Sequence, residues 1–380
     1  MIEAAITEDE IEILKYVREF AQKEVKPFAM EIDRSKAVPA RIIERMKQLG
    51  LFASYIPREY GGAGLSFSFL VRVIEEISKA CPSTALVLDG ALTLFADPII
   101  MFGSKQLKEK YLTRVAKGSV GGLALTEPEA GSDAAGIKTT AVKKGDKFIL
   151  NGTKIFISNG RIAEFFVVDA VTSPGAGHRG ISAFVVDADA EGLRISRDID
   201  KLGIRGSSTV ELVFDNVEVP ESNLIGEINQ GFKVVMDTLD SGRIGIAAQA
   251  IGIAQAALDE AIEYIKQRKQ FGKPISDFQG IQFMIADMAT DLEAARLLTY
   301  KAAEAWDRKE NAVKLSSMAK LKASDVAMDI ATNCLQLFGG YGYTTDLDAE
   351  RHFRDAKITQ IYEGTNQIQR VIIARELLRS

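Results

Sequence analysis

The segment Ile361–Arg370, which reads IYEGTNQIQR, places a carboxylate between an aromatic residue and a glycine. Glu363 is either a solvated charge in a loop or a base positioned to remove a proton. With His178 and His352 as its only histidines, the chain has to use Asp, Glu, Lys or Tyr for acid–base chemistry. Taken alone, the segment favours the loop charge, because most glutamates are exposed.

Four further stretches combine glycine with hydroxyl, aromatic or cationic side chains, and each also has an ordinary structural explanation. Leu123–Gly136 (LALTEPEAGSDAAG) is a polar cradle for a ligand or a simple turn. Phe156–Gly160 (FISNG) ends a strand with an aromatic residue that is either core or a ligand contact. The cations of Arg268–Pro274 (RKQFGKP) either complement a helix dipole or meet phosphates. The glycines of Phe338–Tyr343 (FGGYGY) allow close approach of a ligand or a neighbouring chain.

The secondary structure expected around these stretches changes twice along the chain, from helix to strand and back to helix. Apolar residues recur at helical spacing up to about residue 117. A capping box formed by Thr7 and Glu10 begins the first helix of this region, and Pro27 interrupts that helix. Further helices are expected over 39–49, 67–79 and 84–95. Short β-rich runs follow, and Asn151-Gly152 predicts a hairpin turn. From about residue 231 helical spacing returns. This order is not alternating βαβ, so a Rossmann domain is not expected.

Composition excludes several classes of protein. The chain has 380 residues, of which 47% are hydrophobic and 26% charged, as in globular proteins of two or three domains. Its net charge of -5 gives no electrostatic reason to expect nucleic acid binding. Two cysteines, Cys81 and Cys334, form no disulfide framework. We expect no signal peptide, no membrane insertion, no metal site and a cytoplasmic location.

Six stretches in order, TEPEAGSD, FISNG, LDSGRIGIAAQAIGIAQAALDEA, RKQFGKP, FGGYGY and IYEGTNQIQR, make the chain resemble the acyl-CoA dehydrogenase family. The resemblance covers essentially the whole chain and is closest to the short-chain, butyryl-CoA type. It implies an α+β fold with an N-terminal all-helical domain (1–117), a central small β-barrel or sandwich domain (118–230) and a C-terminal four-helix bundle (231–380). It also implies FAD between the β domain and the C-terminal helices of a homotetramer, built as a dimer of dimers.

The resemblance assigns three groups of FAD contacts. The first group comprises Leu123, Ala124, Leu125, Thr126, Ser132, Phe156, Ile157 and Ser158, with the hydroxyls of Thr126 and Ser158 beside the isoalloxazine ring. The second group is expected to bind the FAD of a neighbouring subunit and comprises Arg268, Phe271, Gln279, Gln336, Leu337, Phe338, Gly339 and Gly340. The third group follows Glu363 directly and comprises Thr365, Asn366 and Gln367.

The resemblance also makes Glu363 the base that removes the Cα proton of an acyl-CoA thioester, while the Cβ hydride goes to flavin N5. Desolvation should raise the pKa of this carboxylate, and its backbone N–H should help to bind the thioester oxygen. Some relatives carry the base on the long helix, at the position of Gly242 here, so Glu363 has no competitor. The predicted acyl-CoA contacts are Ser132, Asp240, Arg243, Tyr362 and Gly364. An electron-transferring flavoprotein is the expected electron acceptor.

Four positions depart from the family pattern. Phe156 and Ser158 stand where many members have Trp and Thr, and Glu129 replaces a frequent glycine. Asp89, in VLDGALTLFADPI, aligns with the helix that lines the acyl pocket. There are two interpretations. In the first, Asp89 caps a helix or faces solvent; in the second, it reaches the acyl cavity. In the second case it serves as a second base on a cyclic acyl group, as in relatives that act on alicyclic acyl-CoA thioesters.

Other functions on the same pattern are an O₂-using acyl-CoA oxidase, a nitroalkane-oxidising flavoenzyme and a non-enzymatic helical scaffold. A nitroalkane oxidase is expected to use Asp as its base, which disfavours that option. A scaffold predicts no bound flavin. The pattern leaves the acyl group and the physiological direction of the reaction open.

Overall fold

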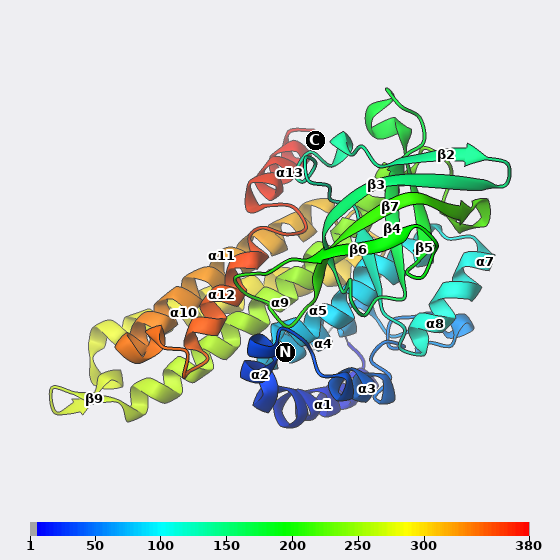
Figure 1. Cartoon of the computed structure of the whole chain (residues 1–380). Coiled ribbons are helices and arrows are strands. Elements are labelled where there is room, and N and C mark those ends of the chain that lie inside the picture. Colours follow the sequence, from blue (N-terminus) through cyan, green and yellow to red (C-terminus); the bar gives the residue numbers. More distant parts are fainter. Residues whose placement is uncertain (1–5, 380) are drawn as a thin grey trace.

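The structure of the protein, a computed structural model, describes residues 6–379. Helices from both ends of the chain pack together, and a β domain built from the middle of the chain lies to one side of them (Figure 1). The predicted order of helices, β domain and helices is therefore confirmed.

The N-terminal domain is helical throughout. The predicted capping box is present: Thr7 Oγ1 accepts from the Glu10 N–H (3.2 Å) and Glu10 Oε2 accepts from the Thr7 N–H (2.8 Å). A short 3₁₀ segment around Pro27 separates the first two helices, as expected. The α-helices are α1 (Glu8–Phe20), α2 (Ala29–Ser35), α3 (Ala40–Gln48), α4 (Phe67–Ala80), α5 (Pro82–Asp89), α6 (Asp97–Phe102), α7 (Lys105–Leu107) and α8 (Thr113–Ala116).

The sequence was also expected to contain no apolar run long enough to span a bilayer, and this expectation is wrong for one segment. Pro82–Phe102, which comprises α5, a π-helical segment (Gly90–Ala96) and α6, is long and apolar enough to cross a membrane by length and composition. However, 83% of its most apolar window is buried inside the protein. Its hydrophobicity is that of a core helix, which the α4 and α9 helices enclose.

The β domain is one mixed sheet in the order β6-β7-β3-β2-β4-β5-β8, with β1 parallel to β4. Apolar side chains that alternate along the strands, such as Phe148, Phe184 and Leu212, form its own core. The strands are β1 (Gly121–Ala124), β2 (Thr140–Lys144), β3 (Lys147–Ser158), β4 (Phe165–Val171), β5 (Ile181–Asp187), β6 (Leu193–Asp198), β7 (Thr209–Pro220) and β8 (Leu224–Ile225).

The hairpin turn predicted at Asn151-Gly152 is wrong, because β3 runs through these residues without a break. The β2–β3 turn lies instead at Gly145 and Asp146. Gly152 sits at a register shift between β3 and β7, where a Cβ atom would lie 2.3 Å from Thr139 Oγ1. The glycine is therefore required by a bulge and a close approach rather than by a turn.

The C-terminal domain is built around one long helix, α9 (Gly231–Gln267), which is buried on nearly all sides in its middle. The helices α4, α10, α11 and α12 surround it, which explains why it carries apolar residues all round. The other elements are a hairpin of β9 (Lys269–Gln270) and β10 (Lys273–Pro274), and the helices α10 (Gln279–Asp307), α11 (Val313–Phe338), α12 (Ala349–Thr359) and α13 (Asn366–Leu378).

Candidate active site

Glu363 lies against a glycine face of α9. A Cβ atom at Gly242 would lie 2.2 Å from Glu363 Oε2, so only glycine leaves room for the carboxylate there. Oε2 is buried and has no hydrogen-bond partner within residues 6–379. The Oε2 atom of the predicted base is thus buried and unengaged, although the residue as a whole is half-buried, so the interpretation as a solvated loop charge is wrong for this carboxylate.

The turn that presents Glu363 is strained. Glu363 has a φ of 52° and Gly364 a φ of 90°, so two consecutive residues adopt the left-handed conformation. For a glutamate this costs about 1–2 kcal/mol. Gln369 Nε2 donates to the carbonyls of Glu363 (3.2 Å) and Gly364 (2.9 Å), and Lys320 Nζ donates to the carbonyl of Gly364 (2.8 Å). These bonds offset the strain and fix the turn.

Several charged groups set the protonation of this site. Burial raises the pKa of Glu363 well above its ordinary value, the nearby Asp89 raises it further, and Arg243 and Lys320 oppose the rise. Burial also lowers the pKa of Lys320 to about 7. A carboxylate with a raised pKa is a stronger base, so the expected direction of the shift is confirmed.

Asp89 faces the same side of α9 one helical turn further on. A Cβ atom at Gly245 would lie 2.2 Å from Asp89 Oδ1. The side chain is 1% exposed, Oδ1 accepts from Thr93 Oγ1 (3.0 Å), and Oδ2 has no partner within residues 6–379. Burial raises its pKa to about 7. The interpretation that Asp89 caps a helix or faces solvent is therefore wrong.

The predicted acyl-CoA contacts on α9 form an ion pair close to Glu363. Arg243 Nη1 lies 2.6 Å from Asp240 Oδ1, and both side chains are buried. Ser316 Oγ also donates to Asp240 Oδ1 (3.1 Å). The positive charge of Arg243 stabilises the ionised form of Glu363 and so opposes the rise in the pKa of that carboxylate.

Tyr362 reaches the same helix, α9, as Glu363. Its hydroxyl donates to Gln249 Oε1 of α9, and Gln249 Nε2 donates to the carbonyl of Pro82 (3.0 Å). Gln249 was not among the predicted site residues. Its only signal in the sequence is a polar side chain within an apolar helix.

The first group of predicted FAD contacts forms one strip along the end of β3. The Ile155 N–H donates to the carbonyl of Thr126 (2.8 Å), which lays the Leu123–Ser132 loop against the strand. Phe156 is 59% exposed with a φ of 61°. Thr126 and Ser158 are half-buried and Ser132 is exposed, and no side-chain hydrogen bond engages their hydroxyls within residues 6–379. An exposed aromatic ring beside unengaged hydroxyls fits a flat, polar-edged cofactor such as a flavin.

Two charged residues that sequence reasoning missed hold this loop in place. Lys154 is fully buried and donates to the carbonyl of Leu125 (2.9 Å) and to Glu127 Oε1 (2.8 Å). Glu127 in turn accepts from the N–H groups of Lys138 (2.6 Å) and Thr139 (3.0 Å). Glu129, the unexplained departure, forms an exposed ion pair with Lys138 and takes no part in this network.

The second group of predicted FAD contacts lies elsewhere. Arg268, at the C-terminal end of α9, stacks over the ring of Tyr341 (5.6 Å), and Phe271 at the tip of the β9–β10 hairpin is 93% exposed. The 37 residues of α9 span about 55 Å. Figure 1 shows β9 at the far end of this helix from the sheet. One chain therefore does not bring the first and second groups together.

The third group divides by role. Thr365 caps α13 and accepts from the Ile368 N–H (3.4 Å), while Gln367 is exposed. The side chain of Asn366 is turned inward: its Oδ1 accepts from Lys320 (2.9 Å), and its Nδ2 donates to Ser324 and Asp325. Asn366 thus joins α13 to α11, and its contact with FAD stays a prediction.

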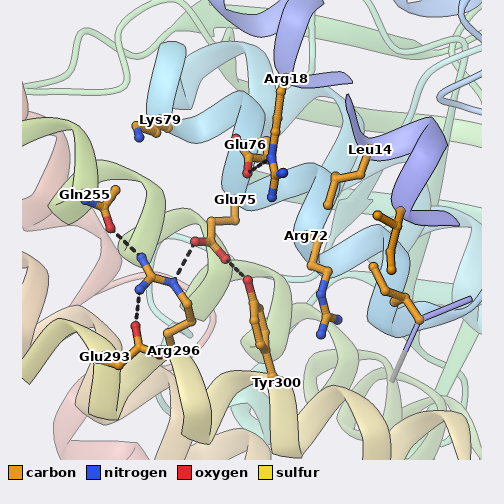
Figure 2. Close-up of a pocket in the computed structure, with 12 residues that line it drawn as sticks. Leu14, Arg18, Arg72, Glu75, Glu76, Lys79, Gln255, Glu293, Arg296 and Tyr300 are labelled. Carbon is orange, nitrogen blue, oxygen red and sulfur yellow. Dashed lines mark hydrogen bonds and ion pairs between the residues drawn. The ribbon is translucent and has the colours of Figure 1, made fainter. Parts of the chain in front are cut away.

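A separate cavity of about 330 Å³ lies between α1, α4, α9 and α10 (Figure 2). Arg296 donates there to Glu75 (3.0 Å), Glu293 (2.5 Å) and Gln255 (2.6 Å), and Tyr300 donates to Glu75 (2.6 Å). These groups satisfy one another, so the cavity is a polar helix junction. None of the predicted site residues lines it.

The comparison with known proteins covers the whole chain. The N-terminal, middle and C-terminal domains of acyl-CoA dehydrogenase match residues 7–119, 122–217 and 229–378. An acyl-CoA dehydrogenase of Bacillus subtilis is 47% identical over 98% of this chain and 99% of its own.

Two solved structures are also similar. The butyryl-CoA dehydrogenase of Megasphaera elsdenii is 43% identical with a TM-score of 0.96, over 98% of this chain and 99% of its own. A chain in a structure described as the electron transferring flavoprotein of Acidaminococcus fermentans is 48% identical with a TM-score of 0.97, over 99% of both chains.

Proposed function

Because the chain belongs to the acyl-CoA dehydrogenase family of FAD-dependent oxidoreductases, we propose that it introduces an α,β double bond into an acyl-CoA thioester with Glu363 as the base. One observation carries this proposal: Oε2 of the carboxylate is buried, has no hydrogen-bond partner within residues 6–379 and lies against Gly242. The strip along β3 fits the flavin, for which Leu123–Ser132, Phe156 and Ser158 provide the contacts.

The residues of the chain act by binding, orientation and proton transfer. Glu363 removes the Cα proton, and its raised pKa matches it to that weakly acidic group. The Glu363 N–H donates to no group within residues 6–379, so it is available to bind the thioester oxygen. Gly364 provides the left-handed backbone that the turn needs, and a Cβ atom there would lie 2.7 Å from Gln369 Nε2 rather than in open space beside the base. FAD, when bound, supplies the hydride acceptor.

The test is Glu363→Gln, which keeps the shape of the side chain and removes the base. We expect the variant to retain its flavin and to reduce it with substrate about 10²–10⁴-fold more slowly. Glu218→Gln, an exposed glutamate paired with Lys147, serves as the control. A Glu363→Gln enzyme that bleaches at the wild-type rate would show that another group is the base.

We propose a short-chain acyl group as the first candidate substrate. The similarity to butyryl-CoA dehydrogenase of Megasphaera elsdenii supports it. An alicyclic acyl-CoA, with Asp89 as a second base, is the other candidate. The burial of Asp89 on the same glycine face as Glu363 favours this alternative, since a buried carboxylate without a cation partner is costly unless it serves a ligand.

Turnover of butyryl-CoA, cyclohexanecarboxyl-CoA and cyclohexenecarboxyl-CoA by the wild type and Asp89→Asn distinguishes the two candidates. Selective loss of the cyclic substrates in Asp89→Asn supports the second base. An unchanged substrate preference removes it and leaves the short-chain assignment.

An oligomer completes the cofactor site in this proposal, because the two groups of predicted FAD contacts lie at opposite ends of α9. We propose the homotetramer implied by the family resemblance. Light scattering of the holoenzyme tests it, and a monomer that binds FAD with full affinity contradicts it. We also propose a cytoplasmic location, which the free, buried Cys81 and Cys334 support.

The proposed electron acceptor is an electron-transferring flavoprotein, a choice supported by the similarity to the Acidaminococcus fermentans chain. The alternative is an acyl-CoA oxidase that uses O₂. Anaerobic reduction by substrate followed by exposure to air separates the two. Slow reoxidation in air, accelerated by added flavoprotein, supports the dehydrogenase.

A further inference from the structure

The turn Glu363–Gly364 has no regular secondary structure of its own to keep it in the left-handed conformation. The Asn366 N–H donates to the Gln360 carbonyl across the base of the turn (3.0 Å), but no backbone N–H within residues 6–379 donates to the carbonyls of Glu363 and Gly364. A glutamate persists in such a conformation only where surrounding contacts over-determine it. The contacts that meet these two carbonyls therefore decide where the carboxylate points.

Both carbonyls are bound by side chains that are completely buried. Lys320 of α11 and Gln369 of α13 are each 0% exposed. Lys320 Nζ donates hydrogen bonds to the Gly364 carbonyl (2.8 Å) and to Asn366 Oδ1 (2.9 Å). Gln369 Nε2 donates to the carbonyls of both Glu363 and Gly364. Gln369 Oε1 has no partner within residues 6–379, so the two carbonyls alone orient this amide.

We propose that Lys320 and Gln369 are positioning residues for Glu363: from two different helices they hold the strained turn that aims its carboxylate at Gly242. The inference rests on the proposed role of Glu363 as the base. A base must stay within contact distance of the proton it removes, and a misplacement of about 1 Å can cost about 10²-fold in rate. Neither residue touches the substrate in this proposal.

Lys320 has a second effect that Gln369 lacks, because its amine is charged below its pKa of about 7. The ionisable groups that face Glu363 are Asp89 from α5, Arg243 from α9, Lys320 from α11 and the adjacent Tyr362. Removing one of the two cations leaves the carboxylate with less stabilisation of its charged form. The rising limb of the pH–rate profile should then move to higher pH.

The experiment compares Lys320→Met and Gln369→Met, each of which keeps an unbranched side chain of similar length and removes the donors. Lys322→Met is the matched control, since Lys322 lies on the same helix in an exposed pair with Asp291 (2.6 Å). We expect substrate-driven flavin reduction to fall about 10–100-fold in both variants, with KM changed far less. Only Lys320→Met should shift the pH profile.

A readout without flavin or substrate completes the test. Hydrogen–deuterium exchange of the peptide 358–369 should rise in the apoprotein of both variants and stay unchanged in Lys322→Met. If Lys320→Met does not fold, Gln369→Met alone carries the test, because it removes no charge. Wild-type rates with unchanged exchange would overturn the inference. Full turnover by Glu363→Gln would instead overturn the proposed base and leave the exchange result standing.

Discussion

The substitution Gly242→Ala should slow flavin reduction by substrate without lowering the stability of the fold. A Cβ atom there would lie 2.2 Å from Glu363 Oε2 and 2.9 Å from Leu94 Cδ2, whereas ordinary contacts begin at 3.4 Å. The carboxylate therefore has to retreat by about 1 Å, which by itself predicts a loss of about 10²-fold in the rate of the proton-removal step. The carboxylate is the far end of a flexible side chain, so the fold should tolerate this retreat.

The stability of Gly242→Ala should therefore be unchanged or higher. Alanine in a helix interior is favoured over glycine by about 0.5–1 kcal/mol, which offsets the small cost of displacing the ends of the Glu363 and Leu94 side chains. The assay pairs stopped-flow flavin reduction with thermal unfolding. Gly280→Ala is the control, because a Cβ atom at this position of α10 meets no atom within 4 Å. A wild-type reduction rate in Gly242→Ala, or a large loss of stability, would refute the reasoning.

Three further predictions concern stability and assembly. Burial raises the pKa of Asp169 from 3.8 to about 7. Its contribution to the stability of the fold is therefore complete below about pH 4 and is lost as the pH rises through 7. Asp169→Asn should flatten the decline of Tm between about pH 5 and 8, and an unchanged dependence of Tm on pH contradicts this. Lys154→Met strands the Glu127 carboxylate and should lower the free energy of unfolding by about 3–5 kcal/mol in urea titrations, whereas Lys138→Met at the exposed pair should change it little. Phe271→Ser should weaken the oligomer without lowering protomer stability, as measured by light scattering and thermal unfolding; an unaltered mass at low concentration would exclude this hairpin from the interface.

Local chemistry made much of the fold predictable. The capping box at Thr7, the break at Pro27 and the helical spacing of α4 and α9 depend on residues within a few positions of one another. Binary patterning is equally local, so the order of helices, β domain and helices followed from the chain alone. The Asn151-Gly152 error has the converse cause: a pair typical of turns was held straight by its neighbours β2 and β7.

The site divides in the same way. The sequence alone, through the resemblance carried by six stretches, singled out Glu363 and a flavin. Only the tertiary structure decided that Asp89 shares the glycine face of α9, that Lys320 and Gln369 bind the carbonyls of the Glu363–Gly364 turn, and that the predicted FAD contacts fall at opposite ends of one helix. These relations join segments far apart in the chain, and packing rather than local preference determines which buried polar atoms meet.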